Sequence, residues 1–181
     1  MPVVTGSAPL RRLLADGAAI GAAFSAVVLS TLWLDRRLWL ADYPPDIRAA
    51  VGPGVAAPFA LQVAAGAAVM AVIVGGTALS NRRAWKAAPA AHGALAAFAH
   101  TVGLFVIVSL VVLLVSDWFA LVTLRPDFAV FPGTGDLAGY RDYGYHVRAG
   151  FLTWRPWAGG LALSAIMAAV AWSWGRGDAR G

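Results

Sequence analysis

Residues 93–124 read GALAAFAHTVGLFVIVSLVVLLVSDWFALVTL, and His100 and Asp117 are the only side chains in this run that can carry a charge. A helix needs about 20 apolar residues to cross the hydrocarbon core of a bilayer, so the run predicts a membrane-spanning helix. At the rise of an α-helix it would be about 45 Å long, which predicts a span that tilts or projects beyond the lipid.

Three further apolar runs lie at residues 17–34, 55–79 and 156–174, and none of them contains a charged residue. Each is long enough to cross a bilayer as a helix. Continuous apolar runs exclude a transmembrane strand barrel, in which apolar and polar residues alternate. The sequence therefore predicts an all-α membrane protein, a bundle of four transmembrane helices forming a single membrane domain over residues 1–181.

The composition agrees with this fold class. Of the 181 residues, 60% are hydrophobic and 13% are charged, whereas a soluble domain is about 45–50% apolar and about 25% charged. The absence of cysteine excludes disulfide scaffolds, thiol catalysis and thiolate metal sites. The net charge of +5 is spread over small separated groups, which favours contact with anionic lipid and predicts no nucleic-acid partner.

The charges also predict an orientation. With four spans, both termini and the loop after residue 80 share one face, which carries Arg11, Arg12, Arg82, Arg83, Lys86, Arg176 and Arg180 against Asp16 and Asp178. The outer face carries seven arginines and seven aspartates. Because unpaired basic residues near span ends favour the cytoplasm, we expect both termini there, in a bacterial inner (plasma) membrane. The apolar run that continues to Leu34 favours a retained anchor over a secretion signal cleaved near residues 23–26.

The two long connections, at residues 35–54 and 125–155, fall on the outer face. The first contains ADYPPDIR at positions 41–48. Its prolines exclude one continuous helix through Asp42 and Asp46. Pro45 suits the first turn of a short helix over residues 46–51, ended by Gly52. Long connections with this aromatic and proline content tend to be ordered and functional, so we expect the two loops to form a cap.

The candidate polar site lies on this cap or just beneath it and comprises Asp42, Asp46, Asp117, Arg125, Asp142, Tyr143 and His146. The Asp42/Asp46 and Asp142/His146 groups could converge and bind a divalent cation through oxygen and imidazole ligands. Alternatively, the aspartates pair with Arg48, Arg125, Arg141 and Arg148 and tie the loops into a lid. The equal numbers of acids and arginines favour this second arrangement, so we expect no metal.

Asp117 lies seven residues inside the outer end of the third span. A charged side chain at membrane depth costs about 2.5–3.5 kcal/mol on insertion scales, so it should face protein or water and have a partner. Asp117 is therefore a proton relay, an anchor for a polar ligand, or one half of a buried ion pair with an arginine such as Arg125 or Arg155. Alternatively, the long helix brings Asp117 to the membrane interface.

We expect no cofactor. His92 and His100 would lie more than ~10 Å apart on one helix and cannot both ligate a single haem. The chain has no glutamate, no G-x-S-x-G elbow and no H-E-x-x-H pair. These features disfavour an enzyme, although the outer-loop Asp and His groups keep that hypothesis open.

Small residues recur every four positions in two of the spans, at positions 17, 21 and 25 and at positions 160, 164 and 168. This spacing lets helix backbones approach closely. It predicts compact packing within the bundle, or a homodimer formed through one of the two faces.

Several motifs resemble those of an uncharacterised group of bacterial four-span membrane proteins. The motif D-Y-P-x-D-I is matched at residues 42–47, and D-W at residues 117–118. P-x-F, P-G-T and Y-x-D-Y-x-x-H are matched at residues 126–128, 132–134 and 140–146. Where the group has an acid after P-G-T, this chain has Gly135 and then Asp136. The resemblance implies a four-helix membrane fold with an outward-facing site, and it implies no particular activity.

Three functional hypotheses follow. The first is a multi-pass membrane protein of the binding or accessory class, whose cap engages a partner protein or a lipid. The second is an oligomeric transporter or channel for a small ligand, with Asp117 in the path. The third is a membrane enzyme that uses the outer-loop Asp and His groups. The expected partners are the lipid bilayer and either another membrane protein or further copies of this chain.

Overall fold

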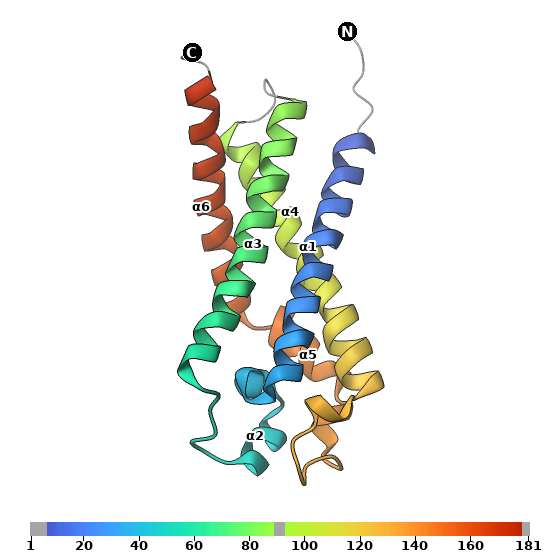
Figure 1. The fold of residues 1–181 in the computed structure, drawn as a ribbon. Coiled ribbons are helices and arrows are strands. Elements are labelled where there is room, and N and C mark those ends of the chain that lie inside the picture. The colour runs from blue at the N-terminus through green and yellow to red at the C-terminus, as the bar shows by residue number, and fades with distance from the viewer. Residues whose placement is uncertain (1–6, 89–92, 179–181) are drawn as a thin grey trace.

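The computed structural model describes residues 7–88 and 93–178 and has the form of an elongated helical bundle (Figure 1). The long helices are α1 (Ser7–Leu34), α3 (Phe59–Ala87), α4 (Ala94–Val112), which continues as η3 (Leu113–Leu124), and α6 (Trp154–Asp178). They provide four helical spans that are long and apolar enough to cross a membrane. The described residues include no strand, so the predicted all-α four-helix membrane fold is confirmed. His92 and Arg180 lie outside the described residues.

The helices and the apolar runs do not have the same ends. Both α1 and α3 extend past the predicted spans at the end where the termini lie, because polar residues can continue a helix outside the hydrocarbon region. α3 begins at Phe59 rather than at Val55. Pro58 takes the position before its first turn, where the missing N–H of a proline does no harm.

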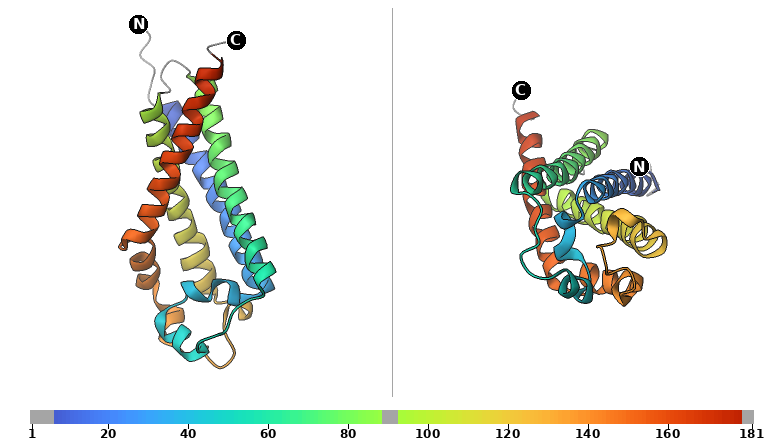
Figure 2. Two further views of the ribbon diagram at one scale, coloured as in Figure 1. Left: turned by 90° about the vertical axis from the view of Figure 1, so that its left-hand side faces the viewer. Right: turned by 60° about the horizontal axis from the view of Figure 1, so that its bottom comes forward.

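The chain passes up and down the bundle, so its two described ends lie at the same end of the bundle. Ser7 at the start of α1 and Asp178 at the end of α6 lie at one end, which we call the terminal end (Figures 1 and 2). The segments 35–58 and 125–153 lie at the opposite end, which we call the cap end. α4 contacts α1, α3 and α6, so the most apolar run of the sequence forms the central helix.

Small residues bring the neighbouring helices close to α4. A Cβ added to Gly17 or to Gly21 of α1 would lie 2.7 Å from a β-branched side chain of α4. A Cβ added to Gly160 of α6 would lie 2.5 Å from the ring of Phe105. Such distances leave no room for a side chain, so both predicted small-residue faces pack inside the bundle against α4.

Short helices build the cap. They are η1 (Arg36–Asp42), α2 (Pro45–Val51), η4 (Asp127–Ala129), η5 (Ala138–Arg141) and α5 (Tyr143–Phe151). α2 is the short helix that the proline pattern predicted. Pro45 occupies its first turn, and Gly52 ends it with a φ of 85°, which favours glycine.

The cap has a hydrophobic core of its own. Ile47 and Tyr43 from the first loop are buried with Phe131 and Tyr140 from the second, around Leu32 at the end of α1. The rings of Phe131 and Tyr140 meet that of Tyr43 edge to face, with centroids 5.3 and 6.1 Å away. Both loops are therefore packed into one unit at the cap end of the bundle.

Hydrogen bonds to the backbone join the two loops. Tyr43 Oη donates to the carbonyl oxygen of Ala129 at 2.7 Å, and the Arg36 guanidinium donates to that of Val130. The ion pairs of the cap are local, between Asp35 and Arg37 and between Asp142 and Arg148. Of the predicted pairings, that of an aspartate with Arg148 is present, but among the described residues no Asp–Arg pair crosses from one loop to the other.

Candidate functional site

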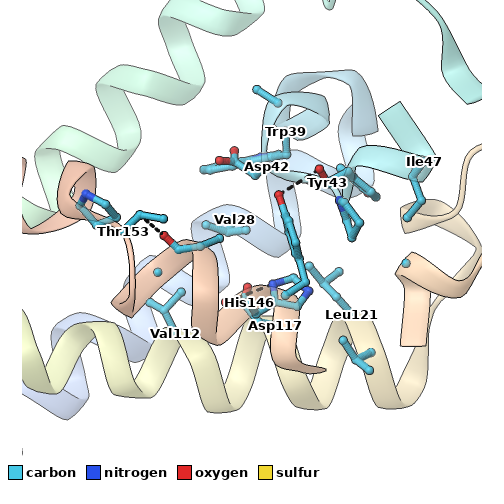
Figure 3. Close-up of a pocket in the computed structure, with 18 of the residues that line it drawn as sticks. Val28, Trp39, Asp42, Tyr43, Ile47, Val112, Asp117, Leu121, His146 and Thr153 are labelled. Atoms are coloured by element: carbon cyan, nitrogen blue, oxygen red, sulfur yellow. Dashed lines mark hydrogen bonds and ion pairs between the residues drawn. The ribbon is translucent and has the colours of Figure 1, made fainter. Parts of the chain in front are cut away.

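A pocket of about 1100 Å³ lies at the cap end, between the membrane-spanning helices and the cap (Figure 3). Its lining comes from α1, η1, α2, the end of α4, η3, η5, α5 and the start of α6. α3 supplies none of the lining residues. Segments that are far apart in the sequence therefore build one site, which needs both the bundle and the cap.

The wall formed by the spans is apolar. Phe24, Val28 and Leu32 line the pocket from α1, where their spacing of four residues puts them on one face of the helix. Val112 and Leu121 line it from α4 and η3. These residues suit an apolar part of a ligand, whereas polar groups, including Asp117 of η3, line other parts of the pocket.

Asp117 lines the pocket from η3, and its partner is His146 of α5. Asp117 Oδ2 lies 3.5 Å from His146 Nδ1, and the two side chains are 27% and 13% exposed. Figure 3 shows the pair where α5 crosses η3. The predicted need for a partner is met, but by a histidine of the second loop rather than by Arg125 or Arg155.

The helix around Asp117 is unusual, because η3 is a π-helix over Leu113–Leu124. The N–H of Arg125 donates to the carbonyl oxygen of Ala120, five residues back, at 3.0 Å. π-helical segments are rare and often occur at functional sites. A π-helix has more residues per turn than an α-helix, and this changes which side chains face the pocket. An α-helical wheel of residues 113–124 therefore does not describe the faces of this helix.

Asp42, at the end of η1, faces the pocket on the side opposite to the Asp117–His146 pair (Figure 3). Water reaches its carboxylate from the pocket, yet protein surrounds the group on most sides. This desolvation raises the pKa of Asp42, and the negative charge of Asp117 raises it further, whereas the positive charge of Arg48 lowers it. Asp42 forms no ion pair or side-chain hydrogen bond with any described residue.

The other two predicted acids hold backbone groups instead. Asp46 Oδ2 accepts from the N–H of Gly139 at 2.8 Å and so joins the two loops. Asp142 caps α5, accepting from the N–H of Tyr145 at 2.9 Å, and it pairs with Arg148 at 2.7 Å. The hydrogen bond from Tyr145, with help from Arg148, holds the pKa of Asp142 below its usual value.

Arg125 and Tyr143 do not line the pocket. Arg125 ends η3 in the left-handed conformation, with a φ of 45°. The hydroxyl of Tyr143 is hydrogen-bonded to Thr123 at 2.9 Å, and its ring meets that of Trp118 edge to face. Of the seven predicted site residues, the structure thus brings Asp42, Asp117 and His146 together at one pocket.

Among the lining residues that we did not predict as site residues are Arg48, Tyr145 and Arg155. Tyr145 Oη donates to the carbonyl oxygen of Tyr43 at 3.1 Å, and burial raises the pKa of Tyr145, so its hydroxyl stays protonated. From the sequence we considered the two arginines only as partners for aspartates. An arginine that shares the outer face with aspartates is the signal that could have identified them as pocket residues.

A second polar group lies near the terminal end, where α1, α3 and α4 meet. Ser80 Oγ donates to Asp16 Oδ2 at 2.7 Å and lies 2.9 Å from His100 Nε2. Arg83 pairs with the same carboxylate at 3.3 Å. This group gives His100 a hydrogen-bonded place in the bundle, whereas His92 is outside the described residues.

Within residues 7–88 and 93–178, no three Asp or His side chains come together in an arrangement that could hold a metal ion. A scan of family models, a search of curated proteins and a search of solved structures each found no match for this chain. The resemblance of its loop motifs to other four-span proteins stays a prediction. The pocket itself carries the functional argument.

Proposed function

We propose that this multi-pass membrane protein binds one molecule of an amphiphilic lipid in the pocket at its cap end. The observation that carries the proposal is the division of the pocket. Its α1 side is apolar, with Phe24, Val28 and Leu32, whereas Asp42 of η1 and the Asp117–His146 pair of η3 and α5 provide its polar groups. An amphiphile matches both sides at once, because its chain and its head have the same polarity as the two walls.

The position of the pocket supports a lipid rather than a soluble ligand. The apolar wall belongs to helices that can cross a membrane, and the charged residues lie where those helices end. Trp154, at the start of α6, lines the pocket and is 73% exposed, as an aromatic residue at the headgroup level would be. A lipid could therefore keep its head near the membrane surface while its chain follows α1.

Transport has less support than binding. The two polar groups, around Asp117 and around Asp16, lie near opposite ends of the bundle. Between them along α1 and α4, Ile20, Leu104 and Val108 form a buried apolar cluster. A polar path through the bundle would have to open this cluster, so we place the function in the pocket.

The proposal is tested with a lipid that carries a photoreactive diazirine in its acyl chain. Purified protein in detergent is irradiated with the lipid, and the labelled peptides are identified by mass spectrometry. We expect label on α1 between Phe24 and Leu32 and near Leu121, removed by excess unlabelled lipid. The proposal would be overturned by label on the exposed residues at the cap end of α3, such as Phe59 and Val63, that excess unlabelled lipid does not reduce.

A pair of variants tests the same point in a different way. Val28→Trp puts a large ring into the apolar wall of the pocket, whereas Ile166→Trp adds the same ring on the exposed outside of α6. We expect the first to lose the competed label and the second to keep it. If Val28→Trp keeps the label at full strength, the acyl chain of the lipid does not bind in this pocket.

A further inference from the structure

The pocket contains charged side chains of both signs that have no partner. Asp42, Arg48 and Arg155 all line it, and none of them forms an ion pair or a side-chain hydrogen bond with residues 7–88 or 93–178. Elsewhere in the cap, acids and arginines do pair, as Asp35 with Arg37 and Asp142 with Arg148, both at 2.7 Å. The pocket is thus the place where charges of the cap stay open to a ligand.

The lining therefore carries charges of both signs. Asp42 and Asp117 are acidic, with Asp117 beside His146, whereas Arg48 and Arg155 are basic. A purely anionic head would meet the carboxylates, and a purely cationic head would meet the guanidinium groups, each with an unfavourable Coulomb interaction. A head with both charges can place each charge beside a side chain of opposite sign.

Each sign has a chemical preference. A carboxylate is only an acceptor, so it favours a cation with N–H donors, such as a primary ammonium with its three donors. A trimethylammonium offers no such donor. Guanidinium groups match the oxygens of a phosphate, which they can bind in pairs.

The positions of the charges fit the same molecule. Arg155 is exposed near the start of α6, beside the exposed Trp154, where the phosphate of a membrane lipid would lie. Asp42 lines the same pocket from η1 and is likewise exposed, whereas the Asp117 side chain is 27% exposed. A phosphate held by Arg155 would leave the ammonium group free to reach Asp42 within the pocket.

We propose that the bound amphiphile carries a zwitterionic head of a phosphate diester and a primary ammonium group, as in phosphatidylethanolamine. Asp42 holds the ammonium group, with Asp117 facing it across the pocket, and Arg155 with Arg48 holds the phosphate. This inference rests on the proposed function, because it names the head of the lipid that the pocket takes.

The experiment is competition against the photoreactive lipid in detergent, with unlabelled lipids of matched chains. The competitors are phosphatidylethanolamine, phosphatidylcholine, phosphatidylglycerol and the soluble glycerophosphoethanolamine. We expect phosphatidylethanolamine to compete about tenfold better than the other two lipids, the effect of a lost hydrogen bond to a charged group. Glycerophosphoethanolamine shares the head and shows whether the head alone, without chains, is enough for binding.

Variants assign the charges. Asp42→Asn should remove the preference over phosphatidylcholine, and Arg155→Gln should weaken competition by all three phospholipids about equally. Asp136→Asn and Arg141→Gln change exposed cap residues outside the pocket and should leave the order of the competitors unchanged.

A failure of the headgroup assignment can be told apart from a failure of the proposed lipid binding. Equal competition by the three lipids would overturn the zwitterionic head and leave lipid binding intact. Stronger competition by phosphatidylglycerol or phosphatidylcholine would also overturn it. Absence of competition by any lipid, with label scattered over the outside of the bundle, would overturn the proposed function itself.

Discussion

The cap and the bundle of this protein are held together by different means. The cap has large side chains at its centre, including Ile47, which is fully buried, and the rings of Tyr43 and Phe131. The bundle instead brings its helices together at glycines, such as Gly21 against α4. Tyrosine hydroxyls tie the cap to backbone carbonyls, whereas small residues leave room for close backbone contact in the bundle.

The difference follows from the two solvents. In water, burying a large apolar side chain is favourable in itself. In lipid, the surroundings are as apolar as the side chain, so helices gain from close packing and from few polar contacts. The pocket lies between the two regions. Its apolar wall comes from the bundle, and its charged side chains come from both, since Asp117 and Arg155 lie on membrane-spanning helices whereas Asp42 and Arg48 lie in the cap.

The largest effect that separates the two regions should come from the core of the cap. Ile47→Ala removes a fully buried side chain and should lower the free energy of unfolding by about 2–5 kcal/mol. Its matched control is Ile166→Ala on α6, where the side chain is 60% exposed and the change should be close to zero. Thermal and denaturant unfolding of the two purified variants provides the comparison. Equal losses in both would show that the cap has no core of the kind described.

A smaller effect is expected from the close contacts of the bundle. Gly21→Ala would place a methyl group 2.7 Å from Val111 and should destabilise the protein by about 1–3 kcal/mol through overpacking. Gly75 of α3 has open space around it, so Gly75→Ala is the matched control and should have little effect. Thermal unfolding in one detergent measures both. If Gly75→Ala were the more damaging change, α3 rather than α1 would make the close contact.

The smallest effect comes from Asp42, at the boundary between the bundle and the cap. Here the substitution is expected to stabilise the protein rather than to destabilise it. The pKa of Asp42 is raised in the folded protein, so the folded state holds this proton more tightly than the unfolded state. The ionised carboxylate therefore destabilises the fold, and the loss appears as the pH rises through the folded-state pKa. We expect Asp42→Asn to be more stable than the wild type at neutral pH, by less than about 1 kcal/mol for a water-accessible group.

This gain should disappear in acid, below the ordinary aspartate pKa of 3.8, where the wild-type carboxyl is protonated in both states. Melting temperatures measured across the pH range test the prediction, with Asp136→Asn as an exposed control. A variant that is less stable than the wild type at neutral pH would mean that the Asp42 carboxylate has a structural partner. A gain in stability together with weaker lipid binding is the result expected of a binding residue.

Local rules were sufficient for a large part of the molecule. Proline and glycine positions predicted α2, because Pro45 fits a first turn and Gly52 takes a positive φ. The small residues at positions 17, 21 and 160 predicted close helix contacts, and those contacts occur. The extension of the long helices beyond the apolar runs was missed, because hydropathy reports the hydrocarbon region and not the ends of a helix.

The four spans, the small-residue faces and the polar character of the cap depend on composition and short-range spacing, so they could be predicted from the residues alone. Which acids are available to a ligand depends on the packing of the helices. Asp42 and Asp46 lie four residues apart, yet one faces the pocket and the other holds the N–H of Gly139. Asp117 meets His146 rather than an arginine because α5 crosses a π-helix at that point. Such contacts join segments distant along the chain, and they depend on how the helices cross, which no local pattern of residues specifies.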